Sequence, residues 1–299
     1  MKAGISLAGL DIGTTGCKAA IFDDSGVLLA SVSREYTVDV PQPKWAEQDA
    51  ENVWRLAQGA LREATTKADA HEVVALGLSV QGEAVMPVDG NGQALRPAIL
   101  GMDSRTGEQN AWLCERFGAE HLFERTGMPA HTVNTLPKLL WLKQYEPELW
   151  ARAERFLLYE DFLIQKMTGQ AVISRCLASR TQLFDIPGDR WSPEILQAIE
   201  LDPESLATVQ PSGTAVGPMR TELAESLGLA NAPLVVTGGH DQACGALGVG
   251  LVRPGLAMDS TGTAEVVEVA LEAPVLNETL YRGDISVYAH TAPGLYLAM

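Results

Sequence analysis

The sequence predicts an α/β protein whose chain opens with an antiparallel meander of three strands. Residues 4–10 and 17–23 have the composition of buried strands, and the turn between them contains Gly-Thr-Thr-Gly. A second turn, Asp-Ser-Gly, precedes a third expected strand at 27–33. Consecutive strands joined by such short turns pair antiparallel with their neighbours.

A helix and a fourth strand are expected directly after the meander. Apolar residues recur with helical spacing over 50–67, and Asp49 is the expected N-cap of that helix. Residues 73–80 are mostly apolar, which is typical of a strand buried on both faces. This order predicts the ribonuclease-H-like (actin/hexokinase-like) ATPase fold, because a Rossmann domain would run strand–helix–strand from its start.

Further elements complete the first expected domain. A buried strand at 233–237 leads into a helix of small residues at 241–248. The other expected helices are 104–117, 136–146, 159–168, 192–200 and 219–228.

A break at Pro254-Gly255 divides the chain. Residues 256–259 and 265–271 then repeat the strand–turn–strand pattern of the N-terminus, which indicates an internally duplicated fold. We predict one full domain over 1–250 and the beginning of a second over 251–299, because the second copy is far shorter than a usual domain.

Charge and cysteine content restrict the expected partners. The net charge of −16 (22 Lys and Arg against 38 Asp and Glu) opposes binding to nucleic acids and to anionic membranes, so neither is predicted. The four cysteines form no C-x-x-C pair and are expected to be free thiols in a reducing compartment. With no secretory signal and no apolar run of about 18 residues, we expect a cytoplasmic protein.

The first candidate site is the turn D-I-G-T-T-G-C-K at the end of the first strand. Gly13 lets the backbone approach phosphate oxygens, and the hydroxyls of Thr14 and Thr15 can donate to them. Lys18 adds a positive charge, and Asp11 is placed to hold Mg²⁺ through water. A plain hairpin with a glycine turn explains the same residues, so the turn alone leaves both alternatives open. It is not a Walker A loop.

The second candidate is Asp241, in the run T-G-G-H-D-Q-A-C-G. A carboxylate at a helix start can cap the helix, which is the ordinary structural explanation. The functional interpretation is a general base aimed at a substrate hydroxyl held over the two glycines.

The third candidate is the turn D-S-T-G-T-A of the second hairpin. The hydroxyls of Thr261 and Thr263 and the amide of Gly262 suit the outer phosphates of a nucleotide. A tight turn is the alternative, and the motif alone is weak.

Taken in this order, the three motifs resemble those of the FGGY family of carbohydrate kinases, and xylulokinase-like members in particular. The resemblance covers nearly the whole chain. Nothing in the sequence matches the remainder of the family's second domain, so we expect a chain truncated in that domain. Further matching stretches are Trp45–Asp49, Pro97–Arg105, Pro137–Trp141, Asp161–Leu163 with Met167–Gly169, and Ala178–Asp185.

The resemblance implies a function for each motif. It implies ATP-dependent phosphorylation of a sugar or polyol, most readily a ketose such as xylulose, with Mg²⁺ as the metal cofactor. Asp241 would be the catalytic base and a substrate contact, and Asp11 would support the metal ion. The residues expected to hold phosphates are Gly13, Thr14, Thr15, Lys18, Thr261, Gly262 and Thr263.

Four residues are expected to contact the sugar: Gln81, Glu83, Asp103 and Arg105. A surface salt-bridge cluster is the alternative explanation for the charged members of this set. The chain departs from the family at Gly101, where a tryptophan is usual. The run Q-G-E at 81–83 matches neither the Q-M-H of xylulokinases nor the Q-R-E of glycerol kinases.

Two other classes of function are compatible with the sequence. A non-catalytic sugar-binding fragment of a truncated kinase would fit the early C-terminus. An actin-like chaperone or assembly ATPase would share the fold, but the matches in the sugar segments disfavour it. The sequence leaves open whether the protein is a homodimer.

Overall fold

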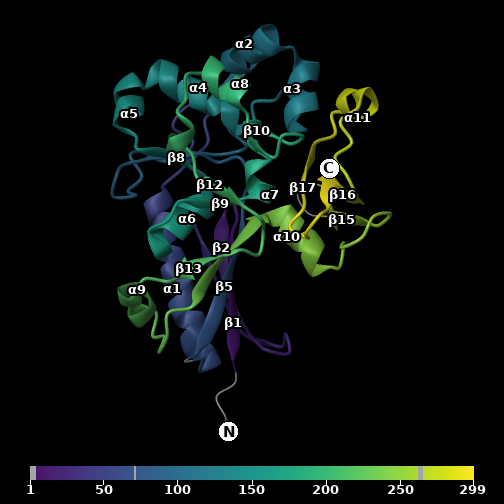
Figure 1. The fold of residues 1–299 in the computed structure, drawn as a ribbon. Helices are drawn as coiled ribbons and strands as arrows, with labels where there is room; N and C mark the ends of the chain where they lie inside the picture. The colour runs from purple at the N-terminus through teal and green to yellow at the C-terminus, as the bar shows by residue number, and fades with distance from the viewer. Residues whose placement is uncertain (1–4, 71, 262–264) are drawn as a thin grey trace.

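The computed structural model describes residues 5–70, 72–261 and 265–299. A mixed sheet of six strands forms the body, in the order β13-β14-β5-β1-β2-β3 (Figure 1). Its strands are β1 (Ser6–Ile12), β2 (Gly16–Asp23), β3 (Leu28–Glu35), β5 (Val73–Val80), β13 (Ala215–Pro218) and β14 (Leu234–His240). β1 to β3 pair antiparallel in chain order, which confirms the predicted meander. β5 runs parallel to β1, and β14 runs parallel to β5.

Helices α1 (Ala50–Ala68) and α6 (Tyr159–Thr168) cover one face of this sheet. α1 begins after Asp49, whose carboxylate accepts from the backbone amides of Glu51 and Asn52 at 3.0 Å. The predicted helix and its N-cap are thereby confirmed. The helix ends at Asp69, which adopts a left-handed backbone.

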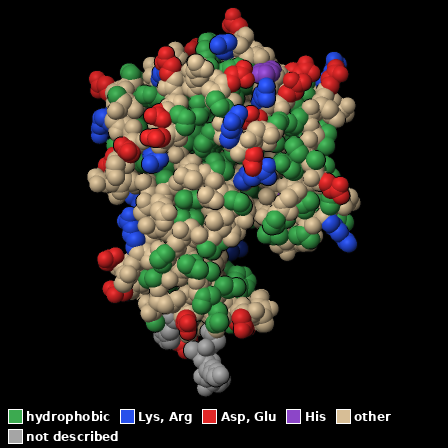
Figure 2. Space-filling view, viewed as in Figure 1, with side chains coloured by type: hydrophobic (Ala, Val, Ile, Leu, Met, Phe, Trp, Pro, Cys, Tyr) green, Lys and Arg blue, Asp and Glu red, His purple; other side chains and the backbone are tan. Residues whose placement is uncertain are grey.

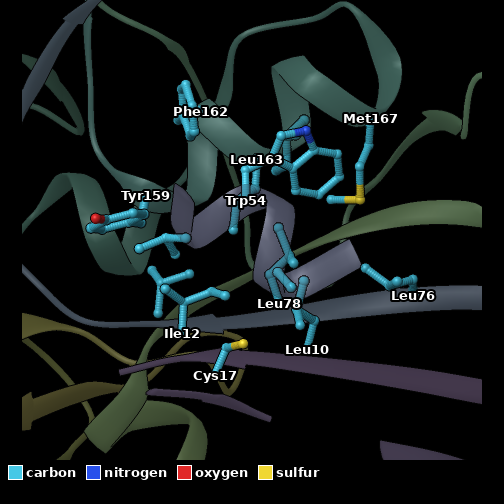
Figure 3. Close-up of a cluster of buried hydrophobic side chains, with 14 of the residues drawn as sticks. Leu10, Ile12, Cys17, Trp54, Leu76, Leu78, Tyr159, Phe162, Leu163 and Met167 are labelled. Atoms are coloured by element: carbon cyan, nitrogen blue, oxygen red, sulfur yellow. The ribbon is translucent and has the colours of Figure 1, made fainter. Parts of the chain in front are cut away.

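The main hydrophobic core lies between these helices and the sheet. Figure 3 shows aromatic and aliphatic side chains of the helices packed over the strand residues that face them. Alternate residues of β1, such as Leu10 and Ile12, are buried in this layer. The labelled core residues are Leu10, Ile12, Cys17, Trp54, Leu76, Leu78, Tyr159, Phe162, Leu163 and Met167.

The intervening residues of the strands point to the opposite face of the sheet. In β1 these are Leu7, Gly9 and Asp11, and Leu7 is 42% exposed. Helix α10 (Asp241–Gly248) packs beside this face against β5 and β14. Asp11 therefore lies on a surface that the helices of the main core do not cover.

A lobe of helices stands at the end of the sheet farthest from the N-terminus (Figure 1). A second buried cluster, with Leu136 and Leu139 among its members, holds this lobe together. Its helices are α2 (Gly107–Phe117), α3 (Ala119–Thr126), α4 (Thr135–Tyr145), α5 (Pro147–Arg152) and α8 (Pro193–Ala198). On the face seen in Figure 2, acidic and basic side chains are interspersed over this lobe.

Short elements connect the lobe to the sheet. The paired strands are β4 (Glu47–Gln48) with β7 (Ala98–Ile99), β6 (Met86–Val88) with β8 (Arg155–Leu157), β9 (Val172–Ser174) with β12 (Thr208–Gln210), and β10 (Phe184–Asp185) with β11 (Arg190–Trp191). The remaining elements are α7 (Arg175–Ala178), a 3₁₀ turn at Pro203–Ser205, and α9 (Thr221–Ser226).

A second, four-stranded sheet follows α10, in the order β15-β16-β18-β17. Its hairpin of β15 (Ala257–Thr261) and β16 (Glu265–Leu271) lies where the sequence predicts a strand pair. The sheet is completed by β17 (Val287–Ala289) and β18 (Tyr296–Ala298), with α11 (Glu278–Arg282) between β16 and β17. The backbone of Ala289 donates to the hydroxyl of Ser179 at 3.0 Å and fixes this sheet to the first part of the chain.

Two predicted elements differ from the structure by three residues at one end. The helix expected over 104–117 begins only at Gly107, because the Asp103 carboxylate accepts from the amide of Arg105 and holds a non-helical turn there. The strand expected over 233–237 continues to His240, because Gly239 and His240 go on pairing with β5. Within the described ranges of the chain, no helix is both long enough and apolar enough to cross a bilayer.

Candidate active site

Strand β14 contributes residues to two cavities near the point where it passes into α10. One, which we call the polar cavity, has a volume of about 330 Å³ and is lined by Thr14, Gln81, Gly82, Glu83, Leu100, Gly101, Met102, Val133, His240 and Asp241. The other, which we call the open-face cavity, has a volume of about 560 Å³. It lies on the uncovered face of the sheet, and its polar lining includes Asp11, Lys18, Ser79 and Thr237.

Asp241 is the first residue of α10 and borders the polar cavity. One carboxylate oxygen, Oδ1, accepts from the backbone amide of Gln242 at 2.7 Å. The other oxygen has no hydrogen-bond partner within the described part of the chain. Since the N-cap residue is His240 and makes no side-chain cap, the carboxylate is not engaged as a conventional helix cap. It is available to a molecule in the cavity.

His240 lies beside this carboxylate, with Nε2 at 3.3 Å from Oδ1 of Asp241. Burial and the charge of Arg180 lower the pKa of His240, whereas Asp241 and Glu83 act to raise it. The net lowering leaves the imidazole neutral at pH 7. Its edge faces Gly82, where an added Cβ would stand 2.7 Å from Cδ2 of the ring.

Glu83 is a buried carboxylate that lines the polar cavity. Its backbone is left-handed (φ 58°), which is a strained conformation for a residue with a side chain. Arg180 donates to Glu83 Oε1 from Nε at 2.7 Å. Burial alone would raise the pKa of Glu83, but the positive charge of Arg180 and the hydrogen bond from its guanidinium outweigh burial and lower that pKa. Glu83 is therefore held as an anion.

Lys138 stabilises the strained backbone of Glu83 through hydrogen bonds. Its ammonium donates to the Glu83 carbonyl at 3.1 Å and also to the carbonyl of Val133. The hydroxyl of Thr135 donates to the same Glu83 carbonyl at 3.1 Å. Burial lowers the pKa of Lys138 to about 7. These contacts explain how the left-handed conformation at Glu83 persists.

Gln81 holds the turn between β1 and β2 against the cavity. Its amide nitrogen donates to the carbonyl of Gly13 at 3.2 Å and to the side chain of Gln48 at 3.0 Å. Tyr36 donates to the Gly13 carbonyl at 2.8 Å, and Gln48 donates to the carbonyl of Thr14 at 2.8 Å. The carbonyls of the turn thus point into the protein and are satisfied there. The exposed side of the turn carries Thr15.

Asp11 and Lys18 face each other across β1 and β2 and line the open-face cavity. Ser79 donates to Asp11 Oδ1 at 2.7 Å. Burial raises the pKa of Asp11; the Ser79 hydrogen bond and Lys18 lower it, and the negative charge of Asp241 raises it further. The negative charge of Asp241 thus acts on Asp11 although the two carboxylates line different cavities.

The described residues contain no group of three or more histidine, cysteine or acidic side chains that could hold a metal ion. Asp11 does fit Mg²⁺ as a single protein ligand, since one of its oxygens is not engaged by Ser79. Mg²⁺ commonly keeps several waters and is bound through one or two carboxylates together with substrate phosphates.

The third predicted phosphate motif is only partly placed. Thr261 ends β15 and is exposed, and it pairs with Glu265 in the hairpin. Gly262 and Thr263 lie outside the described residues, so the turn itself is not placed relative to the two cavities.

Asp103 and Arg105 form a buried ion pair outside the polar cavity. Nη2 of Arg105 donates to Asp103 at 2.7 Å, and Asp103 also accepts from the amide of Ala46 at 2.6 Å. The guanidinium lies 3.6 Å from the ring centroid of Trp45 and 4.7 Å from that of Trp141. Both side chains are at most 1% exposed.

This position corrects the expectation that the pair contacts the sugar. The Asp103 carboxylate is already satisfied by protein donors, and the Arg105 guanidinium lies against two indole rings. The amide of Asp103 donates to the carbonyl of Leu100 at 3.1 Å and closes the turn that carries Gly101 and Met102 into the cavity wall. The pair supports the wall instead of lining it.

Four residues of this site are not among those that the sequence motifs predict: Gly82, Lys138, Arg180 and His240. His240 lies inside the motif that points to Asp241, and Arg180 lies in the matching stretch Ala178–Asp185. The sequence therefore carried a signal for both residues, but it did not show that Arg180 is paired with Glu83.

The comparisons with known proteins decide the family. The model of the N-terminal domain of the FGGY family of carbohydrate kinases matches residues 6–248. The chain belongs to this family.

Curated relatives and solved structures agree with that assignment. The chain is 34% identical over 294 residues to the xylulose kinase of Lactococcus lactis, covering 97% of this chain and 58% of the relative. It is 33% identical over 258 residues to the xylulose kinase of Escherichia coli, covering 86% of this chain and 53% of the relative. The FGGY chain thus spans little more than half the length of these relatives.

The fold matches solved FGGY kinases along nearly its whole length. The xylulose kinase structure from Rhodospirillum rubrum superposes with a TM-score of 0.92 at 26% identity, covering 98% of this chain and 59% of that one. The gluconate kinase structure from Lactobacillus acidophilus gives a TM-score of 0.93 at 23% identity, covering 99% of this chain and 59% of that one, and shows the shared fold. The predicted actin/hexokinase-like fold class is confirmed.

Proposed function

We propose that the chain takes part in the ATP-dependent phosphorylation of a sugar or polyol hydroxyl, with a ketose such as xylulose as the expected acceptor. The observation that carries the proposal is the position of Asp241. Its carboxylate borders the polar cavity, while Gly238 and Cys244, three residues before and after it in the chain, line the open-face cavity. A base placed between an acceptor site and a phosphate site is what phosphoryl transfer to a hydroxyl requires.

The polar cavity is the proposed acceptor site. Asp241, His240, Gln81 and Glu83 supply hydrogen-bonding atoms at its wall, while Leu100 and Val133 supply apolar surface. Such a mixture of apolar surface and a few placed polar groups suits a small polyhydroxy molecule. The oxygen of the acceptor hydroxyl would bond to the γ-phosphorus of ATP as the bond between that phosphorus and the ADP oxygen breaks. Asp241 would accept the proton that the hydroxyl loses.

The open-face cavity and the adjoining turn form the proposed nucleotide side. Lys18 would neutralise phosphate charge, and Gly13, Thr14 and Thr15 would contact phosphate oxygens from the turn. Asp11 would hold Mg²⁺, which reduces the negative charge on the phosphates when it is bound with ATP. Thr261, Gly262 and Thr263 are proposed to contact the phosphates from the second hairpin.

We further propose that residues 1–250 form the acceptor-binding and catalytic domain and that residues 251–299 begin the nucleotide-binding domain. Closure of one domain over the other excludes water in many kinases. Because the chain spans about half of its curated relatives, sugar binding without efficient turnover is the second candidate function.

Sugar-dependent ADP release with a panel of ketoses, aldoses and polyols tests the proposal. Asp241→Asn is expected to abolish the release while keeping sugar affinity within about tenfold. Asp24→Asn, at an exposed turn of the same sheet, is the matched control and should behave as the wild type. Equal ADP release with and without every sugar would contradict the kinase assignment. Sugar binding by calorimetry without any release would favour the second candidate.

A further inference from the structure

Gly82 and His240 both line the polar cavity and lie close to each other. A Cβ built on Gly82 would lie 2.7 Å from Cδ2 and 2.9 Å from Nε2 of His240, and the third-nearest atom is also in that ring. Gly82 is not among the residues with a left-handed backbone, so its conformation would accept a side chain. The imidazole is therefore what restricts position 82 to glycine.

The ring is also fixed relative to Asp241. Nε2 lies 3.3 Å from Asp241 Oδ1, while Nδ1 is buried and finds no hydrogen-bond partner among the described residues. A neutral imidazole carries one proton. A proton on Nε2 places the N–H beside the Asp241 carboxylate and leaves Nδ1 as the unpaired acceptor, which is the less costly arrangement in a buried site.

An aromatic side chain of the second sheet also packs against the ring. Tyr288 of β17 meets it edge to face, with ring centroids 5.9 Å apart. His240 is 6% exposed, and it lines the polar cavity. The ring thus packs against both Tyr288 and Gly82, and these contacts favour its orientation toward Asp241.

We propose that His240 is a positioning residue for Asp241. We also propose that the contact between His240 and Gly82 sets the width of the polar cavity at the end next to Asp241. This inference rests on the proposed kinase function and goes beyond it by naming the pair that selects among sugars. A ring that fills the space above Gly82 restricts the bulk of the substrate group lying next to Asp241. Removing the ring enlarges that end of the cavity and frees the carboxylate.

A double-mutant cycle tests the steric part without any activity assay. Gly82→Ala alone is expected to lower the melting temperature by about 3 °C or more, because overpacking displaces the ring. In a His240→Ala background, Gly82→Ala should lower the melting temperature little, since the obstructing ring is gone. Equal costs of Gly82→Ala in both backgrounds would overturn the proposed contact.

Sugar binding and kinetics test the functional part. Calorimetry on wild type, His240→Ala and His240→Gln with short and long ketoses and polyols should show His240→Ala changing the preference between them by about tenfold. If the wild type releases ADP, His240→Ala should lower kcat more than it changes KM, and His240→Gln, which keeps a donor near Nε2, should recover part of kcat.

The outcomes separate this inference from the kinase proposal. A sugar ranking that is the same in wild type and His240→Ala would overturn the specificity role, whatever the turnover. Sugar binding with altered ranking but no ADP release would support the pair and count against catalysis by this chain. A wild-type chain that binds no sugar in the panel would count against both proposals.

Discussion

The guanidinium of Arg180 donates from Nε to Oε1 of Glu83 at 2.7 Å, and this contact joins residues 97 positions apart in the chain. Arg180 also lies over the ring of Tyr288, at 4.6 Å from its centroid, and donates to the hydroxyl of Ser286 at 3.2 Å. Tyr288 in turn donates to the buried carboxylate of Glu268. A continuous polar network therefore connects the wall of the polar cavity to the second sheet.

The network predicts a large loss of stability when Arg180 is removed. Arg180→Met leaves Glu83 buried without its partner, which is expected to cost about 3–5 kcal/mol of unfolding free energy. Adding Glu83→Gln should recover much of that cost, because the uncompensated charge is then gone. Urea denaturation of the three variants measures both effects.

Arg282→Met is the control for this experiment. Arg282 pairs with Glu278 at 2.6 Å on the surface, and both side chains are more than half exposed. Such pairs contribute little, so this variant should unfold close to the wild type. If Arg180→Met behaved in the same way, the network would not be energetically important.

The neutral His240 predicts a pH dependence of stability. Its pKa in the folded protein is lowered below 6.5 by burial and by Arg180, against the opposing charges of Asp241 and Glu83. The unfolded chain therefore binds the proton more readily than the folded one. The contribution of neutral His240 to the free energy of unfolding is fully present above pH 6.5. It is lost as the pH falls through the lowered pKa of the folded protein.

Unfolding free energies of wild type and His240→Gln at pH 7.5 and 5.0 measure this effect. The wild type should lose more stability between the two values than His240→Gln does, because glutamine does not titrate. Other titrating groups are common to both proteins and cancel in the difference. An identical loss in both would show that His240 is not held neutral by the fold.

The sequence predicted the parts of this structure that depend on local pattern. The strands of the first hairpins, α1 with its cap at Asp49, and α10 follow from alternation, helical spacing and short turns. Each of these elements is specified by residues that are adjacent or one helical turn apart. The family motifs placed Asp11, Lys18 and Asp241 on the surfaces of two neighbouring cavities.

The contacts between distant segments could not be read in the same way. Asp103 and Arg105 look like sugar ligands within their motif, but Trp45 and Trp141 come from other segments and enclose the guanidinium. Gly82 looks like an ordinary loop glycine until His240 is placed beside it. Burial and pairing of this kind depend on the tertiary arrangement, which local spacing does not encode.

The burial of Asp11 predicts that its neutralisation lowers activity without lowering stability. Burial is the main cause that raises its pKa, so at pH 7 the fold bears the cost of a desolvated charge. Asp11→Asn should therefore unfold no more easily than the wild type. Under the proposed role, its Mg²⁺-dependent turnover should fall by about 100-fold or more.

Melting temperature and ADP release measured on the same preparation check this prediction, with Asp24→Asn as the exposed control. Unchanged turnover in Asp11→Asn would remove Asp11 from the proposed metal site. A large drop in melting temperature would show that the hydrogen bond from Ser79 outweighs the cost of burying the charge.

The glycines of β14 and β5 predict two opposite effects of the same substitution. A Cβ on Gly238 would stand 1.5 Å from the carbonyl oxygen of Leu78 on the neighbouring strand, which cannot move without separating β14 from β5. Gly238→Ala should therefore destabilise the protein by about 3 kcal/mol. Gly77 on β5 has no atom within 4 Å of its added Cβ, so Gly77→Ala should be neutral or stabilise by up to about 1 kcal/mol.

Gly238 also connects the six-stranded sheet to the polar cavity. Gly238 lies three residues before Asp241, and its amide donates to the buried carboxylate of Glu160 at 2.7 Å. Displacing β14 would shift Asp241 relative to Gln81 and Glu83, so Gly238→Ala should weaken sugar binding in calorimetry while Gly77→Ala leaves it intact. Equal affinities in the two variants would mean that the position of Asp241 does not depend on the close approach of β14 and β5.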